Sequence, residues 1–136
     1  MIYLGLAETI IIAEEVTGAK RDVLITTSRL DLLDSALAAP SAGFGDTDLY
    51  PSLIEKAAIL GVQISMNHPL VDGNKRLAWM AMVVFLDINN ADLEATDDDA
   101  VEIMLSVARG QTNERALGTW LSSRVSMRPS GSKATQ

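Results

Sequence analysis

Two mainly apolar stretches, residues 60–66 and 77–88, stand on either side of a polar segment, residues 68–76. Apolar residues at this density predict two buried helices, and the polar residues between them predict a loop. We therefore expect a helical hairpin with the polar segment at one of its ends. The second helix, expected over residues 73–89, is apolar all round from Leu77 to Leu86, which predicts that it is the buried central helix of the fold.

Apolar residues recur near helical spacing along the rest of the chain. We expect the remaining helices over residues 3–17, 29–38, 51–67, 97–109 and 114–125. A β-prone run predicts a short flap or β-arm over residues 20–27, and prolines and glycines predict a loop over residues 39–50. Because only 4% of the residues are aromatic, aliphatic side chains must fill the core. The fold class we predict is all-α: a compact bundle of about six helices around the central one.

The length of 136 residues suits a single domain, which we place at residues 1–126, followed by a disordered tail over residues 127–136. The chain has no cysteine, so it has neither a disulfide framework nor a thiolate metal site, and we expect a cytoplasmic protein. Its net charge of −7 argues against direct binding of nucleic acid or of anionic membranes. The longest uncharged apolar run, Leu77–Leu86, is too short to cross a bilayer, and the basic start of a signal peptide is missing.

The polar segment is the most reactive part of the chain. It reads His-Pro-Leu-Val-Asp-Gly-Asn-Lys-Arg and contains the only histidine. Because the second helix is expected to begin near Gly73, the backbone N–H groups of Gly73, Asn74 and Lys75 should lack partners within that helix. Unpaired N–H groups at the positive end of a helix, with Lys75 and Arg76 beside them, predict an anion-binding site.

The other side chains of this segment predict chemistry on the bound anion. Nearby positive charge disfavours a protonated ring at His68, so we expect a neutral imidazole that can accept a proton. Asp72 is a hard oxygen ligand that suits Mg²⁺ beside a phosphate. Gly73 lets backbone approach a ligand closely. A general base, a metal ligand and a cationic clamp together are what phosphoryl-type transfer needs.

Each residue alone also has a purely structural interpretation. His68 can simply be an exposed loop residue, Asp72 can be the N-cap of the second helix, and Gly73 can be an ordinary turn residue. Lys75 and Arg76 are harder to explain in this way, because cations in a first helical turn oppose the helix dipole. The joint spacing, and not any single residue, therefore indicates function.

These nine residues resemble the signature of the Fic/Doc superfamily, His-Pro-Phe-x-(Asp/Glu)-Gly-Asn-(Gly/Lys)-Arg, and the resemblance extends to residues 32–40, 48–58 and 94–99. Lys75 matches the Doc (death-on-curing) branch, because the Fic branch has glycine there. The resemblance implies a small all-α toxin of a toxin–antitoxin pair, held in check by a Phd-like antitoxin in trans. It further implies the activity of the Doc branch, that of a protein kinase that uses ATP to phosphorylate a threonine of elongation factor Tu, which arrests translation.

The resemblance also implies a role for each matching residue. His68 is the catalytic base that deprotonates the target hydroxyl, Asp72 holds Mg²⁺, and Gly73, Asn74 and Arg76 form the anion-binding nest. Lys75 fills space that a glycine leaves open, so the nucleotide should present its γ-phosphate to the acceptor. Trp79 stands where Fic enzymes usually have a second arginine, which favours the same orientation.

Two alternatives stay open. One is a Fic-type AMP transferase. The other is a catalytically weak module that acts through its antitoxin complex, because Leu70 replaces the usual phenylalanine and Met66 stands where relatives often have a basic residue. For the antitoxin we expect an amphipathic segment in a groove near residues 3–17, residues 29–38 and the motif.

Overall fold

The computed structural model describes residues 1–129, and within them the prediction of a mostly α-helical compact fold is confirmed. Seven α-helices form this part of the chain: α1 (Leu6–Thr17), α2 (Arg21–Thr27), α3 (Leu30–Ala38), α4 (Leu53–Asn67), α5 (Asn74–Ile88), α6 (Asp97–Ala108) and α7 (Glu114–Ser122). A short 3-10 helix, η1 (Ala39–Ser41), follows α3. No helix of the described residues is both long and apolar enough to span a bilayer.

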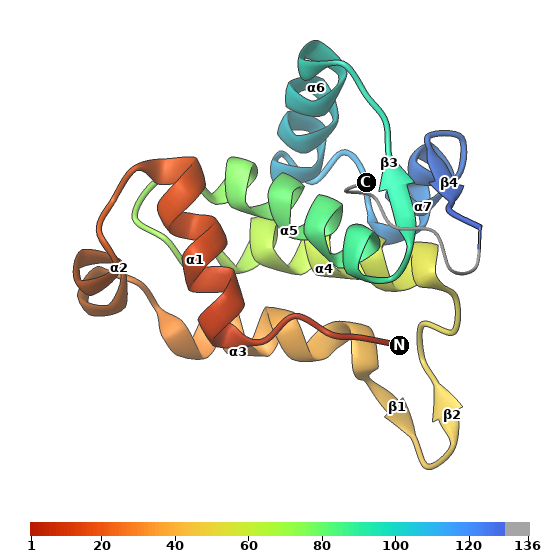
Figure 1. The fold of residues 1–136 in the computed structure, drawn as a ribbon, viewed down its shortest axis with the longest axis horizontal. Helices are drawn as coiled ribbons and strands as arrows, with labels where there is room; N and C mark the ends of the chain where they lie inside the picture. The colour runs from red at the N-terminus through yellow and green to blue at the C-terminus, as the bar shows by residue number, and fades with distance from the viewer. Residues whose placement is uncertain (130–136) are drawn as a thin grey trace.

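Strands form only two small antiparallel pairs in the described residues. The first is the hairpin of β1 (Gly43–Phe44) and β2 (Thr47–Asp48). The second joins β3 (Ala91–Leu93) to β4 (Val125–Met127), with Ala91 opposite Met127 and Leu93 opposite Val125. The first pair lies in the region expected to be a loop, and the second brings the end of the described chain back against the end of α5 (Figure 1).

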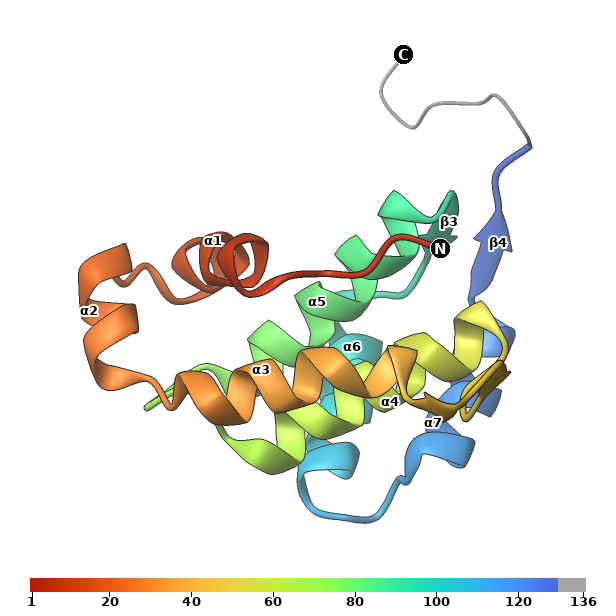
Figure 2. The ribbon, with the colours of Figure 1, turned by 90° about the horizontal axis from the view of Figure 1, so that it is seen from below.

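Helices α4 and α5 form the centre of the fold, side by side and antiparallel (Figure 1). Helix α5 was expected to be the single central helix, but α4 shares this position, because nine residues of α4 are buried and seven of α5. The two helices come close where α4 has Gly61, since a Cβ there would lie 2.5 Å from the sulfur of Met82. The other helices surround this pair (Figure 2). Helix α1 packs against α5, whereas α3 and α7 both pack against α4. Helix α6 contacts both α4 and α5.

The prediction of a flap or β-arm over residues 20–27 is wrong, because this segment contains helix α2. None of the strands in residues 1–129 pairs with this segment, so local helical hydrogen bonds satisfy its backbone groups instead. The hydroxyls of Thr26 and Thr27 bond to carbonyls one turn earlier, of Asp22 and Val23. The β-branched side chains of this run are thereby accommodated in a helix.

Several helix ends differ from expectation by a few residues. The starts of α6 and α7 agree with the expected ranges, and each is capped by the residue before it, since the side chains of Thr96 and Asn113 accept a backbone N–H of their helix. Helix α4 begins after Ser52, which forms a capping box with Glu55, so Pro51 lies outside it. The last helix stops at Ser122 instead of continuing to residue 125.

The boundary placed at residue 126 is also too early. Strand β4 includes Met127, and Arg128 forms ion pairs with Asp87 and Asp92. These contacts tie residues 127 and 128 to the end of α5 and to β3. The rest of the expected disordered tail, residues 130–136, lies outside the described part of the chain.

Candidate functional site

The polar segment connects α4 to α5 at the end of the molecule where α2 lies, and the β1–β2 hairpin lies at the opposite end in both views (Figures 1 and 2). The C-terminal end of α1 packs against this loop. A Cβ at Gly73 would stand 2.8 Å from Cγ2 of Thr17, and Gly73 has a φ of 91°. Both the close approach and the left-handed backbone therefore require glycine at this position.

His68 ends α4 and is exposed to solvent. Its backbone is left-handed, with φ 51° and ψ 55°, and its ring nitrogen Nδ1 lies 3.0 Å from the carbonyl oxygen of Ser65. A carbonyl oxygen only accepts hydrogen bonds, so Nδ1 must carry the proton that joins them. The neutral ring then has its free lone pair on Nε2, which gives His68 the tautomer of a general base.

Asn74 holds the loop closed. Its side-chain oxygen accepts the N–H of Leu70, and its Nδ2 donates to the carbonyl of Leu70, both at 2.9 Å. Leu70 is 5% exposed and Asn74 is 8% exposed, so the apolar side chain and the amide that bonds to its backbone are both buried. The expectation that Asn74 binds phosphate is thus corrected for its side chain, which is used within the loop. Its backbone N–H stays available.

The start of α5 offers three such N–H groups. The described residues contain no hydrogen-bond acceptor for the backbone N–H of Asn74, Lys75 or Arg76. Asp72 accepts only the N–H of Gly73, at 2.9 Å, so it does not cap the helix in the usual way through a later N–H group. The N–H of Gly73, which was expected to lack a partner, is thus bonded to Asp72, and the free groups are those of Asn74, Lys75 and Arg76. With the positive end of the helix dipole beside them, these groups can donate hydrogen bonds to an anion.

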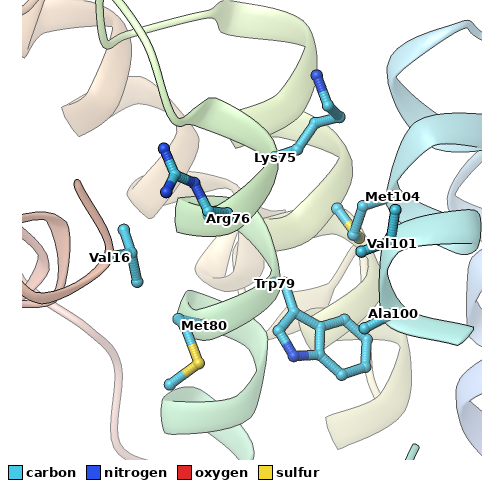
Figure 3. A pocket seen from close by; sticks show the side chains of 8 residues that line it. All are labelled: Val16, Lys75, Arg76, Trp79, Met80, Ala100, Val101 and Met104. Atoms are coloured by element: carbon cyan, nitrogen blue, oxygen red, sulfur yellow. The ribbon is translucent and has the colours of Figure 1, made fainter. Parts of the chain in front are cut away.

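The two cations beside this site point in different directions. Figure 3 shows Arg76 directed to the side of α5 where Val16 lies, and Lys75 directed away from it. The guanidinium of Arg76 lies 3.5 Å from where a Cβ of Gly73 would stand, so it lies over the helix start. Both side chains are exposed and can bind an anion held there.

Asp72 is the carboxylate of the site. It is exposed, and one of its oxygens is bonded to Gly73. The described residues contain no group of three or more histidines or carboxylates that could hold a metal by themselves. Mg²⁺ typically binds protein through only one or two carboxylates and takes further oxygens from phosphates and water, and Asp72 offers one such carboxylate.

An apolar groove adjoins the two cations, with a cavity volume of about 340 Å³ (Figure 3). It is lined by Val16, Lys75, Arg76, Trp79, Met80, Ala100, Val101 and Met104. These residues come from α1, α5 and α6, so the groove is not bordered by residues 29–38 as expected. The ring of Trp79 is fixed by an edge-to-face contact with Trp120, at 6.0 Å between centroids.

Three groups that position His68 and its neighbours were not predicted from the sequence. The carbonyl of Ser65 orients His68, the amide of Asn67 bonds to the carbonyl of Leu32, and the N–H of Arg29 bonds to the carbonyl of Pro69. The signal for one of them was present, because Asn67 is a polar residue between an apolar helix and the only histidine. The other two act through backbone atoms, which no side-chain pattern reveals.

Replacing Asn74 by alanine should lower the free energy of unfolding by about 2–4 kcal/mol, because two buried backbone groups of Leu70 lose their partners. Urea unfolding measures this change. Asn113→Ala is the matched control, since it removes one exposed cap and should cost about 1 kcal/mol. An equal decrease in the free energy of unfolding for the two variants would contradict the role of Asn74 in holding the loop together.

Comparison with known proteins identifies relatives of this chain. The model of the Fic/DOC family matches residues 5–86, which include the whole loop between α4 and α5. The protein named Toxin Doc of Mycolicibacterium smegmatis is 48% identical over 79 residues, which are 57% of this chain and 61% of that protein. The match thus spans about three fifths of the relative's own length.

Proposed function

Because the chain belongs to the Fic/DOC family, we propose that it is a Doc-type toxin of a toxin–antitoxin pair. The proposed activity is that of a protein kinase, which transfers phosphate from ATP to a hydroxyl side chain of a translation factor similar to elongation factor Tu. The name and the identity of the relative support the toxin class. The chemistry of residues 68–76 supports the kinase reading, as follows.

The loop supplies both halves of a phosphoryl transfer. The free N–H groups at the start of α5 and the guanidinium of Arg76 bind the γ-phosphate of ATP. The acceptor hydroxyl oxygen forms a bond to the γ-phosphorus while the bond from that phosphorus to the bridging oxygen breaks, and ADP leaves. The hydroxyl proton goes to Nε2 of His68, which the Ser65 carbonyl keeps unprotonated in the neutral ring.

Asp72 is the residue that would hold Mg²⁺ beside these phosphates. When bound, the ion neutralises charge on the phosphate oxygens. The N–H of Gly73 keeps the Asp72 carboxylate at the helix start, close to where the anion binds.

The presence of lysine at position 75 is the observation that favours phosphate transfer over AMP transfer. Lys75 is the second residue of α5, next to the free N–H groups, and it is exposed. A glycine here would leave the space above the helix start open, whereas a lysine adds bulk and a positive charge. A nucleotide held by this lysine can present its terminal phosphate to the acceptor without placing its other phosphates deep in the loop.

Transfer of label from ATP labelled at either the γ-phosphate or the α-phosphate tests the proposal directly. We expect label from γ-labelled ATP to appear on the translation factor and label from α-labelled ATP to stay in the nucleotide. Label that arrives from α-labelled ATP alone would overturn the kinase proposal in favour of AMP transfer, which uses the same base and the same N–H groups.

The weak-module alternative keeps one observation in its favour. Met66, in the last turn of α4 and two residues before His68, is 56% exposed and offers no charge to a phosphate. Leu70, in contrast, is buried as the anchor of the loop, so its replacement of phenylalanine preserves an apolar contact. Growth of cells that express the chain alone separates the readings: arrest that His68→Asn abolishes supports the enzyme, and normal growth supports the module.

For the antitoxin we propose an amphipathic helix that lies in the groove lined by α1, α5 and α6. The walls of this groove are apolar, and the cations Lys75 and Arg76 stand at one end of it. A helix with an apolar face and an acidic residue at one end matches this pattern. Its acidic end would occupy the place of the phosphates, which explains how such a partner inhibits transfer.

Val101→Glu should weaken antitoxin binding by about tenfold or more, because it places a negative charge in the apolar wall. Val101 is 67% exposed, so the change should leave folding intact. Val23→Glu is the matched control, since Val23 is an exposed valine of α2 outside the groove. Titration of the antitoxin against both variants measures the effect, and equal affinities would contradict the groove as the binding site.

A further inference from the structure

The first turn of α3 and the residue before it hold His68 from both sides. The side chain of Asn67, which precedes the histidine, donates from Nδ2 to the carbonyl oxygen of Leu32 at 2.9 Å. The backbone N–H of Arg29 donates to the carbonyl oxygen of Pro69, which follows the histidine, at 2.8 Å. Both neighbours of His68 are thus tied to one segment that is distant from them in the sequence. We call these two hydrogen bonds the histidine clamp.

A clamp is needed because His68 has an uncommon backbone conformation. Its φ of 51° lies in the left-handed region, which residues with a side chain rarely adopt and which persists only where the surroundings impose it. The position of the ring follows from this backbone, and so does the contact of Nδ1 with the carbonyl of Ser65. If the backbone of His68 relaxed, Nδ1 would leave that carbonyl and the ring would lose its preferred tautomer.

We propose that Asn67 and the N–H of Arg29 are positioning groups of the reaction. Through the histidine clamp they hold His68 with Nδ1 protonated and Nε2 free. The role of Nε2 as the base rests on the proposed function, whereas the orientation of the ring does not. A role limited to docking α3 on α4 would change stability without changing the tautomer.

The experiment uses the fact that His68 is the only histidine of the chain. The ¹⁵N spectrum of the neutral imidazole therefore reports on this ring alone. Asn67→Leu removes the amide and keeps similar bulk. Arg29→Pro removes the N–H donor at a φ of −89°, about 25° from the usual proline value, and the preceding residue is already extended. Arg29→Ala keeps the N–H group and is its matched control.

We expect the neutral ring of the native chain to be protonated mainly on Nδ1. In Asn67→Leu and Arg29→Pro the form protonated on Nε2 should become the larger one, as in free histidine, while Arg29→Ala should resemble the native chain. Asn113→Ala, which loses an amide hydrogen bond far from the site, controls for general loss of stability. With ATP and acceptor, kcat of the two clamp variants should fall about tenfold or more at an unchanged KM for ATP.

Tautomer populations that stay native in Asn67→Leu and Arg29→Pro would overturn the clamp, as would an equal change in Asn113→Ala. The spectrum needs neither nucleotide nor acceptor. A native chain that shows the expected spectra but transfers no label would therefore overturn the proposed function and leave the clamp standing.

Discussion

Replacing His68 by asparagine should lower the rate of label transfer from ATP by about 10²- to 10⁴-fold, the usual contribution of a general base. Asparagine has no group that accepts a proton near neutral pH, so the acceptor hydroxyl keeps its proton. The loss should appear in kcat, because His68 makes no contact with the phosphates in the proposed mechanism. The measurement is the initial rate of transfer from γ-labelled ATP at saturating nucleotide.

Asparagine is a better replacement than alanine at this position because of the backbone. His68 has a φ of 51°, and asparagine adopts the left-handed region more readily than other residues with a side chain. The loop should therefore keep its shape, and the unfolding midpoint should stay near that of the native chain. Comparison with His68→Ala separates the loss of the base from strain in the loop. A transfer rate within threefold of native in a folded His68→Asn variant contradicts the role of His68.

The helices could be predicted because their determinants are local. The apolar stretch from Leu77 to Leu86 has the length and density of a buried helix, and Thr96 and Asn113 are cap residues at the start of periodic segments. Helix α2 could not be predicted in this way. Its Val-Leu-Ile-Thr run has a preference for strands, but none of the described strands pairs with it, and the run forms a helix.

The candidate site, like the fold, could be predicted from the sequence only in part. The sequence pattern predicted an anion site at the start of α5, because unpaired N–H groups follow from the position of a helix start. It did not predict that the side chain of Asn74 bonds to Leu70, or that Asn67 bonds to Leu32 across the fold. Such contacts depend on how α3 is placed against α4, which spacing along the chain does not specify. The contacts of the site that depend on tertiary packing are thus the ones that could not be predicted from the sequence.

Replacing Lys75 by glycine should lower transfer from γ-labelled ATP by about tenfold to a hundredfold, comparable with the loss of a group that stabilises the transition state. The change removes one positive charge beside the free N–H groups and opens the space above the helix start. If Lys75 selects the nucleotide orientation, label from α-labelled ATP should begin to appear on the acceptor. Measuring both labels on the same preparation gives the ratio of phosphate to AMP transfer.

Two controls separate the causes of this effect. Lys75→Ala removes the charge but keeps a Cβ and a good helix former, so it should reduce γ-transfer with little α-transfer. Arg115→Gly makes a similar cation-to-glycine change at the second residue of α7, where it should cost about 1 kcal/mol of stability and leave transfer unchanged. A Lys75→Gly variant that still transfers only the γ-phosphate, at the native rate, means that Lys75 does not choose the phosphate. The choice would then lie with residues that contact the base or the ribose of the nucleotide.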